Sequence, residues 1–331
     1  MNGIESEAMA EKEAVDLKEW KRIALRAARQ QPLPSCPERT LVPVVKLGEK
    51  KTHAPWENTT CPAVVVKVQD LINISGRTMR PVVNRIRTAG DIHKFLGFNG
   101  NVILSSITRD KILLGLEPQT YADLINTIKP DYYLTPDGET YFGREHTSEF
   151  EINRTLADTA FLLHECPNST PIGLVKGCNL AQVETHTDRL LGLGVDMLAF
   201  HAGDYLCRGT YMEVSRAHAF ISAIRKRSSW LMIYGCGKRD FTRFHSANCF
   251  VTQSHFIGAF RGLRLVDGKW SPFDGKVSRQ IIMQNLRELE EALFALDTQR
   301  GLKPWIEENA EQTLTVNGKV QSESGLHRRQ T

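Results

Sequence analysis

The chain has 331 residues, of which 41% are hydrophobic and 24% are charged, and its formal net charge at pH 7 is +4. This composition is that of a soluble globular protein and excludes a disordered, collagenous or disulfide-rich chain. The apolar runs are strand-sized, and none reaches the roughly 18 residues expected of a membrane span. So mild a basic surplus permits nucleic-acid binding without requiring it.

The cysteines indicate a reducing compartment. There are seven, and no two of them form a C-x-x-C pair, which is typical of free thiols in a cytosol. The acidic N-terminal segment has no signal-peptide pattern, so we expect a cytoplasmic protein that is not bound to a membrane. Cys236, His245, Cys249 and His255 lie near one another in sequence, but their spacing does not match a zinc knuckle or ribbon, and no metal site is predicted.

Residues 1–60 are expected to be an N-terminal helical extension followed by a linker. Leu17, Trp20, Ala24 and Ala27 recur at helical spacing, and a proline-rich stretch follows them. This helix would cap one end of the fold or serve as a partner-binding arm.

From residue 61 onwards, short apolar runs alternate with helical patterns such as "PQTYADLINTIK" and "AQVETHTDRLLGLG". The expected strands are 63–68, 101–106, 131–135, 171–175, 195–201, 230–235 and 247–252. A strand and a helix that repeat about every 30 to 40 residues are typical of parallel βα units. The near-continuous apolar character of the strands favours a closed barrel over an open doubly wound sheet.

We therefore expect an α/β protein, a (β/α)8 TIM barrel over residues 61–308 with one strand missed. An amphipathic helix at 278–299 would close the fold, and residues 309–331 would form a flexible polar tail. No G-x-G-x-x-G follows the first strand and no G-x-x-x-x-G-K-[ST] occurs, so dinucleotide and P-loop functions have no sequence support.

Polar and small residues follow the expected strands. In a parallel barrel the site lies at the C-terminal ends of the strands. The candidates there are Ser105, Ser106, Asp137, Glu139, Lys176, Cys178, His201, Asp204, Gly235, Gly237 and residues 248–253. The segments "GLVKGCN", "AFHAGDY" and "IYGCGKRDF" combine an apolar strand with small residues that let a ligand approach the backbone. The pattern predicts a pocket for a small molecule or a base.

The succession "TPDGETY", "INRTLADTAFLL", "PIGLVKGCN", "GLGVDMLAFHAGDY", "WLMIYGCGKRDF" and "ANCFVTQSHFIGAFRG" resembles the tRNA-guanine transglycosylase superfamily of TIM barrels, over about residues 60–265. It looks closest to the divergent branch that inserts 7-deazaguanine bases into DNA. The resemblance implies exchange of guanine for a 7-deazaguanine at an unbroken sugar-phosphate backbone. In that family two aspartates do the covalent work and a third reads the base edge.

By position, the base-reading aspartate of the family falls on Asp137, and the glycine-rich strand end falls on "VKGC", with Lys176 where the tRNA enzymes carry glutamine. The two catalytic aspartates fall on Ser106 and on Asn248 or Val251, depending on the register. The cysteine-rich zinc motif of the tRNA members is absent from the sequence. The resemblance implies base contacts by Ser106, Asp137, Lys176, Gly177, Cys178, His201, Gly203, Gly235 and Asn248.

Base exchange needs a nucleophile or a stabilising group at the anomeric carbon, and an acid for the departing purine. The catalytic candidates are Asp137, His201 and Asp204, because carboxylates serve both roles and histidine can shuttle a proton near neutral pH. The alternatives are that "PDG" is only a turn and that His201 is an ordinary pocket histidine.

A basic rim around the barrel mouth would suit a nucleic-acid backbone, and a solvated surface is the alternative interpretation. The candidates for this rim are Arg225, Lys226, Arg227, Arg261 and Arg264.

Two functions are considered. The first is an enzyme without a cofactor that replaces guanine in DNA, in preference to tRNA, with a 7-deazaguanine base such as preQ0, through a flipped nucleotide. The second is a barrel that binds a base or nucleic acid without chemistry, as a subunit or adaptor. A partner subunit or a homodimer is considered for either. A lyase or hydrolase acting on a small metabolite is disfavoured, because no metal triad or Schiff-base lysine stands out.

Overall fold

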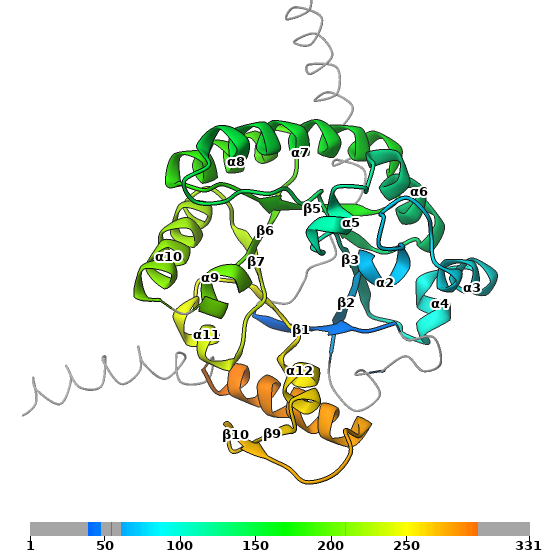
Figure 1. The fold of residues 1–331 in the computed structure, drawn as a ribbon, viewed down its shortest axis with the longest axis vertical. Helices are drawn as coiled ribbons and strands as arrows, with labels where there is room; N and C mark the ends of the chain where they lie inside the picture. The colour runs from blue at the N-terminus through cyan, green and yellow to red at the C-terminus, as the bar shows by residue number, and fades with distance from the viewer. Residues whose placement is uncertain (1–38, 48–53, 55–60, 209, 297–331) are drawn as a thin grey trace, which may run out of the picture.

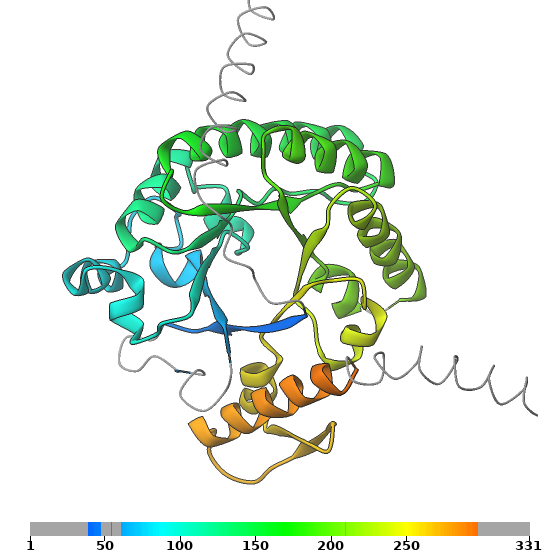
Figure 2. The ribbon, with the colours of Figure 1, turned by 180° about the vertical axis from the view of Figure 1, so that it is seen from behind.

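The computed structural model describes residues 39–47, 54, 61–208 and 210–296, and its centre is a closed parallel barrel. Strands β1 to β8 pair in chain order, and β8 closes the barrel by pairing with β1. Helices surround the strands when the barrel is viewed along its axis from either end (Figures 1 and 2). The predicted (β/α)8 TIM-barrel fold is confirmed.

The strands lie close to the predicted runs, with one addition. They are β1 Thr40–Val45, β2 Ala63–Lys67, β3 Asn101–Ser105, β4 Tyr132–Leu134, β5 Thr170–Val175, β6 Met197–His201, β7 Trp230–Tyr234 and β8 Cys249–Thr252. Strand β1 falls in the range 1–60 that was assigned to the extension, so the barrel begins at Thr40 and not at residue 61. Pro43 and its proline-rich surroundings hid this strand, because proline is rare in central strands. The predicted helix around Trp20 and the tail 309–331 lie outside the described residues.

The helices follow the strands in the expected alternation. They are α2 Val68–Leu71, α3 Pro81–Ala89, α4 Ile92–Leu96, α5 Asp110–Leu113, α6 Pro118–Ile128, α7 Glu145–Glu165, α8 Leu180–Gly192, α9 Gly203–Arg208, α10 Tyr211–Arg225, α11 Lys238–Arg243 and α12 Ser254–Phe260. Local chemistry sets several starts: Asn179 caps α8 by accepting from the Gln182 amide, and Thr210 caps α10 by accepting from the Glu213 amide. These caps fix where each helix leaves the barrel mouth.

Alternate residues of each strand point into the barrel. On β2, Ala63 and Val65 belong to the interior cluster, whereas Val64 and Val66 pack against the helices. The same period of two applies to the other strands. When this period is extended by two residues beyond the apolar ones, polar residues occupy the last inward-facing layer at the C-terminal ends of the strands. These residues include Lys67 on β2, Ser105 on β3, Lys176 after β5, His201 on β6 and Tyr234 on β7. The site is built on this layer.

After β8 the chain adds elements outside the barrel. A hairpin of β9 Leu263–Val266 and β10 Lys269–Pro272 lies beside α12, and a helix covers 279–296 (Figure 1). Asn285 links them, since its Oδ1 accepts from the Leu265 amide at 2.6 Å. Across the described part of the chain, no helix is long and apolar enough to cross a membrane.

Candidate functional site

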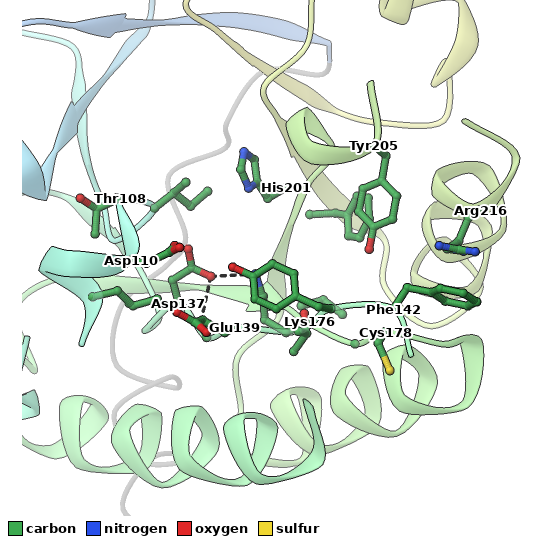
Figure 3. Close-up of a pocket in the computed structure, with 18 of the residues that line it drawn as sticks. Thr108, Asp110, Asp137, Glu139, Phe142, Lys176, Cys178, His201, Tyr205 and Arg216 are labelled. Carbon is green, nitrogen blue, oxygen red and sulfur yellow. Dashed lines mark hydrogen bonds and ion pairs between the residues drawn. The ribbon is translucent and has the colours of Figure 1, made fainter. Parts of the chain in front are cut away.

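A pocket of about 470 Å³ opens at the C-terminal ends of β3 to β6 (Figure 3). Its lining residues are Ile107, Thr108, Asp110, Leu113, Asp137, Gly138, Glu139, Thr140, Tyr141, Phe142, Val175, Lys176, Gly177, Cys178, Phe200, His201, Tyr205, Glu213 and Arg216. It is the volume of a small-ligand site, with aromatic walls and a few convergent polar groups. Asp137, Glu139, Lys176, Gly177, Cys178 and His201, all singled out from the sequence, therefore meet in one cavity.

Asp137 is held in place from three directions. Its Oδ1 lies 2.8 Å from the Lys176 ammonium and accepts from the Gly138 amide at 2.8 Å. Arg154 on α7 donates to the Asp137 carbonyl at 3.1 Å and pairs with Glu151 and Asp158. Both side-chain contacts go to Oδ1, so among the described residues Oδ2 is the oxygen left for a ligand. Residues 135–140 form an irregular loop with no assigned turn, and this loop carries Asp137 into the pocket.

Lys176 is fixed through its backbone as well. Its amide donates to Nδ1 of His186 on α8 at 3.0 Å. Burial lowers the pKa of His186 to about 4, so its imidazole is neutral at physiological pH and can accept this bond. His186 was missed from the sequence because nothing in "AQVETHTDRLL" shows which helix face meets β5.

The ends of β6 and β7 approach each other closely. His201 lines the pocket, and its ring lies edge-on to Tyr234 with the centroids 5.6 Å apart. Gly235 has φ of 86°, and a Cβ there would lie 2.9 Å from the Cα of Gly203. The two glycines do not line the pocket. Their role is to let the His201 and Tyr234 strand ends pack against each other.

Gly177 and Cys178 complete the β5 side. A Cβ at Gly177 would lie 2.8 Å from Val183, so this glycine lets the strand end pack on α8. The amide and Sγ of Cys178 both donate to Oε1 of Gln182, at 3.1 and 3.2 Å. Gln182 in turn donates to the Glu145 carbonyl at 2.9 Å, which ties α8 to the start of α7.

Besides Gly203 and Gly235, two further predicted base contacts are not in the pocket. Ser106 is fully buried, and its Oγ donates to the Thr135 carbonyl at 2.7 Å. Asn248 lies before β8, at the N-terminal end of the strands, where its Oδ1 accepts from the Leu231 amide at 2.9 Å and from Arg225 at 3.1 Å. The placement of Asn248 at the base site is therefore wrong. The sequence run 247–252 was read as one strand, and Asn248 belongs to its opposite end.

The predicted basic rim is also corrected. Helix α10 runs back along the barrel, so Arg225, Lys226 and Arg227 lie at the end opposite to the pocket. Arg227 pairs there with Glu184 and Asp188.

Arg261 directly follows α12, and Arg264 lies on β9. Both are outside the pocket. For the remaining candidate, Asp204, only the backbone, in α9, is described.

A different set of aromatic and basic residues surrounds the mouth. Phe142, with 70% of its surface exposed, lies under the Arg216 guanidinium, whose Cζ is 3.9 Å from the ring centroid. Arg144 lies over Tyr141 at 5.9 Å, and Tyr211 at the start of α10 is 87% exposed. The sequence signal was "TYFGR", directly after the Asp137 loop.

Lys67 is a second residue that the sequence reasoning missed. It ends the buried strand "AVVVK", and a charged residue in that position could have marked it.

For the described residues, no group of three or more histidine, cysteine or acidic side chains is arranged to hold a metal. Cys236 and Cys249 are buried and form no disulfide, and burial raises the pKa of Cys236 well above its usual value.

Comparisons with known proteins add little beyond the fold. No family model matches the chain, and no curated protein matches it. Tryptophan synthase from M. tuberculosis is 11% identical with a TM-score of 0.45, covering 84% of this chain and 98% of that one. The tryptophan synthase alpha subunit of Campylobacter jejuni is 11% identical with a TM-score of 0.46, covering 76% and 96%. An aldolase is 10% identical with a TM-score of 0.40, covering 61% and 81%. Such similarities carry no argument about function.

Proposed function

We propose that this barrel holds a guanine or 7-deazaguanine base of a flipped nucleotide in its pocket and exchanges one base for the other in DNA, in preference to tRNA. The observation that carries the proposal is the fixed carboxylate of Asp137, whose two printed side-chain contacts go to Oδ1 and, within the described residues, leave Oδ2 to accept from a ligand. Guanine presents N1–H and N2–H donors on one edge, and a carboxylate has only acceptors. Adenine lacks this donor pair, so the arrangement favours guanine-type bases.

The walls of the pocket support a planar ligand. Four aromatic side chains line it, Tyr141, Phe142, Phe200 and Tyr205. Figure 3 shows Phe142 and Tyr205 among them. Enzymes that act on a base draw it out of the stack and hold it between such side chains. The exposed aromatic and arginine residues at the mouth support binding of the flanking nucleotides, because stacking platforms and cations together bind single strands.

His201 is the proton donor that we assign to the departing base. It lies on the pocket wall and points into the cavity, as Figure 3 shows. An imidazole titrates near neutral pH, so it can protonate a purine nitrogen as the glycosidic bond breaks. The two aspartate positions of the resembled family hold Ser106 and either Asn248 or Val251, so neither offers a carboxylate. Ser106 is buried and hydrogen-bonded, and Val251 is fully buried inside the barrel. The nucleophile therefore has to be sought elsewhere.

That same observation favours a second candidate, a barrel that binds the base or the nucleic acid without exchanging it. The two are separated by incubating the protein with DNA and, in parallel, with tRNA, each with a labelled 7-deazaguanine base. Incorporation of label supports the exchange reaction and identifies its polymer. Binding of either polymer without incorporation, by a folded sample, supports the second candidate.

The substitution Asp137→Asn tests the recognition step under both candidates. Loss of a charged acceptor costs about 1.5–3 kcal/mol, so we expect affinity for a guanine-type base to fall by roughly 10- to 100-fold. Equilibrium titration with guanine and with 7-deazaguanine measures it. Glu139→Gln is the matched control, since it removes the same charge at the pocket rim and should change affinity less than about twofold. Unchanged affinity in Asp137→Asn would place the base elsewhere.

A further inference from the structure

The ammonium of Lys67 sits in an unusual position for a lysine. It ends β2 on the inward-facing row of Ala63 and Val65, and its Cα pairs in register with that of Ser105 on β3. Within the described part of the chain, Lys67 makes no hydrogen bond or ion pair, and its Nζ lies 5.9 Å from the centroid of the Tyr234 ring. A partly buried amine without an ion pair is costly as a cation, because the charge of Asp70 offsets its desolvation only in part.

The surroundings of Lys67 favour its neutral form. Burial is the largest cause that lowers the pKa of Lys67, and the charge of Arg109 lowers it further. Asp70 acts in the opposite direction. The Asp70 carboxylate is itself partly desolvated, which raises its pKa, and it accepts from the Leu47 amide at 3.1 Å. A larger neutral fraction makes an amine a better nucleophile.

The hydroxyl of Tyr234 is a second, independent anomaly in the same layer. It is buried and faces the side chains of Ser105 and Gln253, but among the described residues it makes no hydrogen bond of good geometry to either. Native proteins satisfy nearly all buried polar groups, so an orphan hydroxyl at a barrel mouth indicates a place where a ligand group belongs. The ring of Tyr234 packs on His201, which lines the pocket, so Lys67 and Tyr234 adjoin the proposed base site.

We propose that Lys67 is the amine nucleophile of the barrel, which attacks C1′ of the flipped nucleotide. This inference rests on the proposed base exchange and supplies its missing group. The electron pair of the neutral amine forms the Nζ–C1′ bond while the C1′–N9 bond breaks, and its pair leaves with the base. The base takes up one proton and Nζ releases one. Attack of the incoming base on C1′ then reverses both steps, so no oxidant or reductant is needed.

The placement of Lys67 suits this role. Strands β2 and β4 are separated only by β3, so Lys67 at the end of β2 and Asp137 just beyond β4 follow strands roughly 10 Å apart, at about 4.8 Å per strand. A guanine whose N1–H edge lies on Asp137 carries N9 on the far side of its ring system. Its sugar is then directed over the barrel mouth, on the side where β2 ends.

The test uses single-stranded and duplex oligonucleotides that carry one abasic site, with sodium borohydride as reductant. The abasic C1′ is an aldehyde, so an amine in reach forms an imine with loss of water, and borohydride reduces it to a stable adduct. We expect one protein–DNA adduct, mapped by peptide mass spectrometry to Lys67. Lys67→Arg should lower its yield at least tenfold. Lys46→Arg, which alters an exposed lysine next to the neighbouring strand β1, should leave the yield unchanged.

An adduct spread over surface lysines, or an undiminished yield in a folded Lys67→Arg protein, overturns the inference. Mapping on the unmodified protein decides the matter even if that variant does not fold. The base-incorporation assay is scored separately. Incorporation that persists in Lys67→Arg overturns the role of Lys67 and leaves base exchange standing. A Lys67 adduct without incorporation overturns exchange and retains the reactive amine. Absence of DNA binding overturns both.

Discussion

Asp137 and Lys176 were both identified from the sequence as residues that follow strands, but their ion pair was not. Which carboxylate meets which ammonium depends on the register of β4 against β5, and sequence spacing does not contain that information. The same holds for Lys67, whose proposed chemistry depends on burial that outweighs the charge of Asp70. Residue types could thus be predicted at this scale, whereas pairings and desolvation could not.

His186 makes the stability of the protein depend on pH. Its folded-state pKa is lowered from 6.5 to about 4, so between these values the unfolded chain binds a proton that the folded chain does not. The free energy of unfolding is therefore unaffected by protonation of His186 above pH 6.5. It falls as the pH drops towards 4, by an amount on the order of 3 kcal/mol. Urea unfolding at pH 7.5, 6 and 5 should show this loss.

His186→Asn is the control for that measurement, since its amide oxygen can accept from the Lys176 amide and does not titrate in this range. Carboxylates titrate in both proteins, so the difference between the two curves isolates the imidazole. Parallel curves from pH 7.5 to 5 would show that folding does not lower the pKa of His186.

At the scale of elements, alternation and strand ends were predictable, and single-residue offsets were not. The apolar runs that correspond to β2 to β8 predicted the barrel, because parallel strands buried on both faces are continuously apolar. Strand β1 was missed because of Pro43, and Asn248 was assigned to the wrong end of β8. Either end of a short apolar run looks alike in sequence, yet the two ends lie on opposite faces of the barrel.

The close approach of β6 and β7 gives a prediction at this scale. Gly235→Ala should destabilise the protein by more than the roughly 1–3 kcal/mol of a strained backbone, because the new Cβ would also lie 2.9 Å from backbone atoms of Gly203. Urea unfolding measures the loss. Gly194→Ala is the matched control, since its φ is 88° and nothing lies within 4 Å of the added carbon. Equal losses in the two variants would show that the strand ends can move apart.

For the whole molecule, the proposed site and one set of structural contacts lie at opposite ends of the barrel axis. Ion pairs and capping contacts of Arg225, Arg227 and Asn248 lie at the N-terminal end of the strands, and the pocket, Asp137 and Lys67 lie at the other end. The barrel could be predicted from the βα repeat. Which basic residues surround the mouth could not, because a helix of unknown length and direction carries each of them to one end or the other.

This separation predicts a variant that loses stability but keeps its ligand affinity. Asn248→Ala removes the acceptor for the Leu231 amide and for Arg225, and leaves a partly buried donor without a partner. We expect the free energy of unfolding to fall by about 1–3 kcal/mol. Affinity for a guanine-type base, titrated well below the unfolding transition, should stay within about twofold of the unmodified protein. A selective loss of affinity in a stable Asn248→Ala protein would instead return Asn248 to the ligand site. It would contradict the assignment of the pocket to the Asp137 end of the barrel, because a substitution at the opposite end should reach the ligand only through global unfolding.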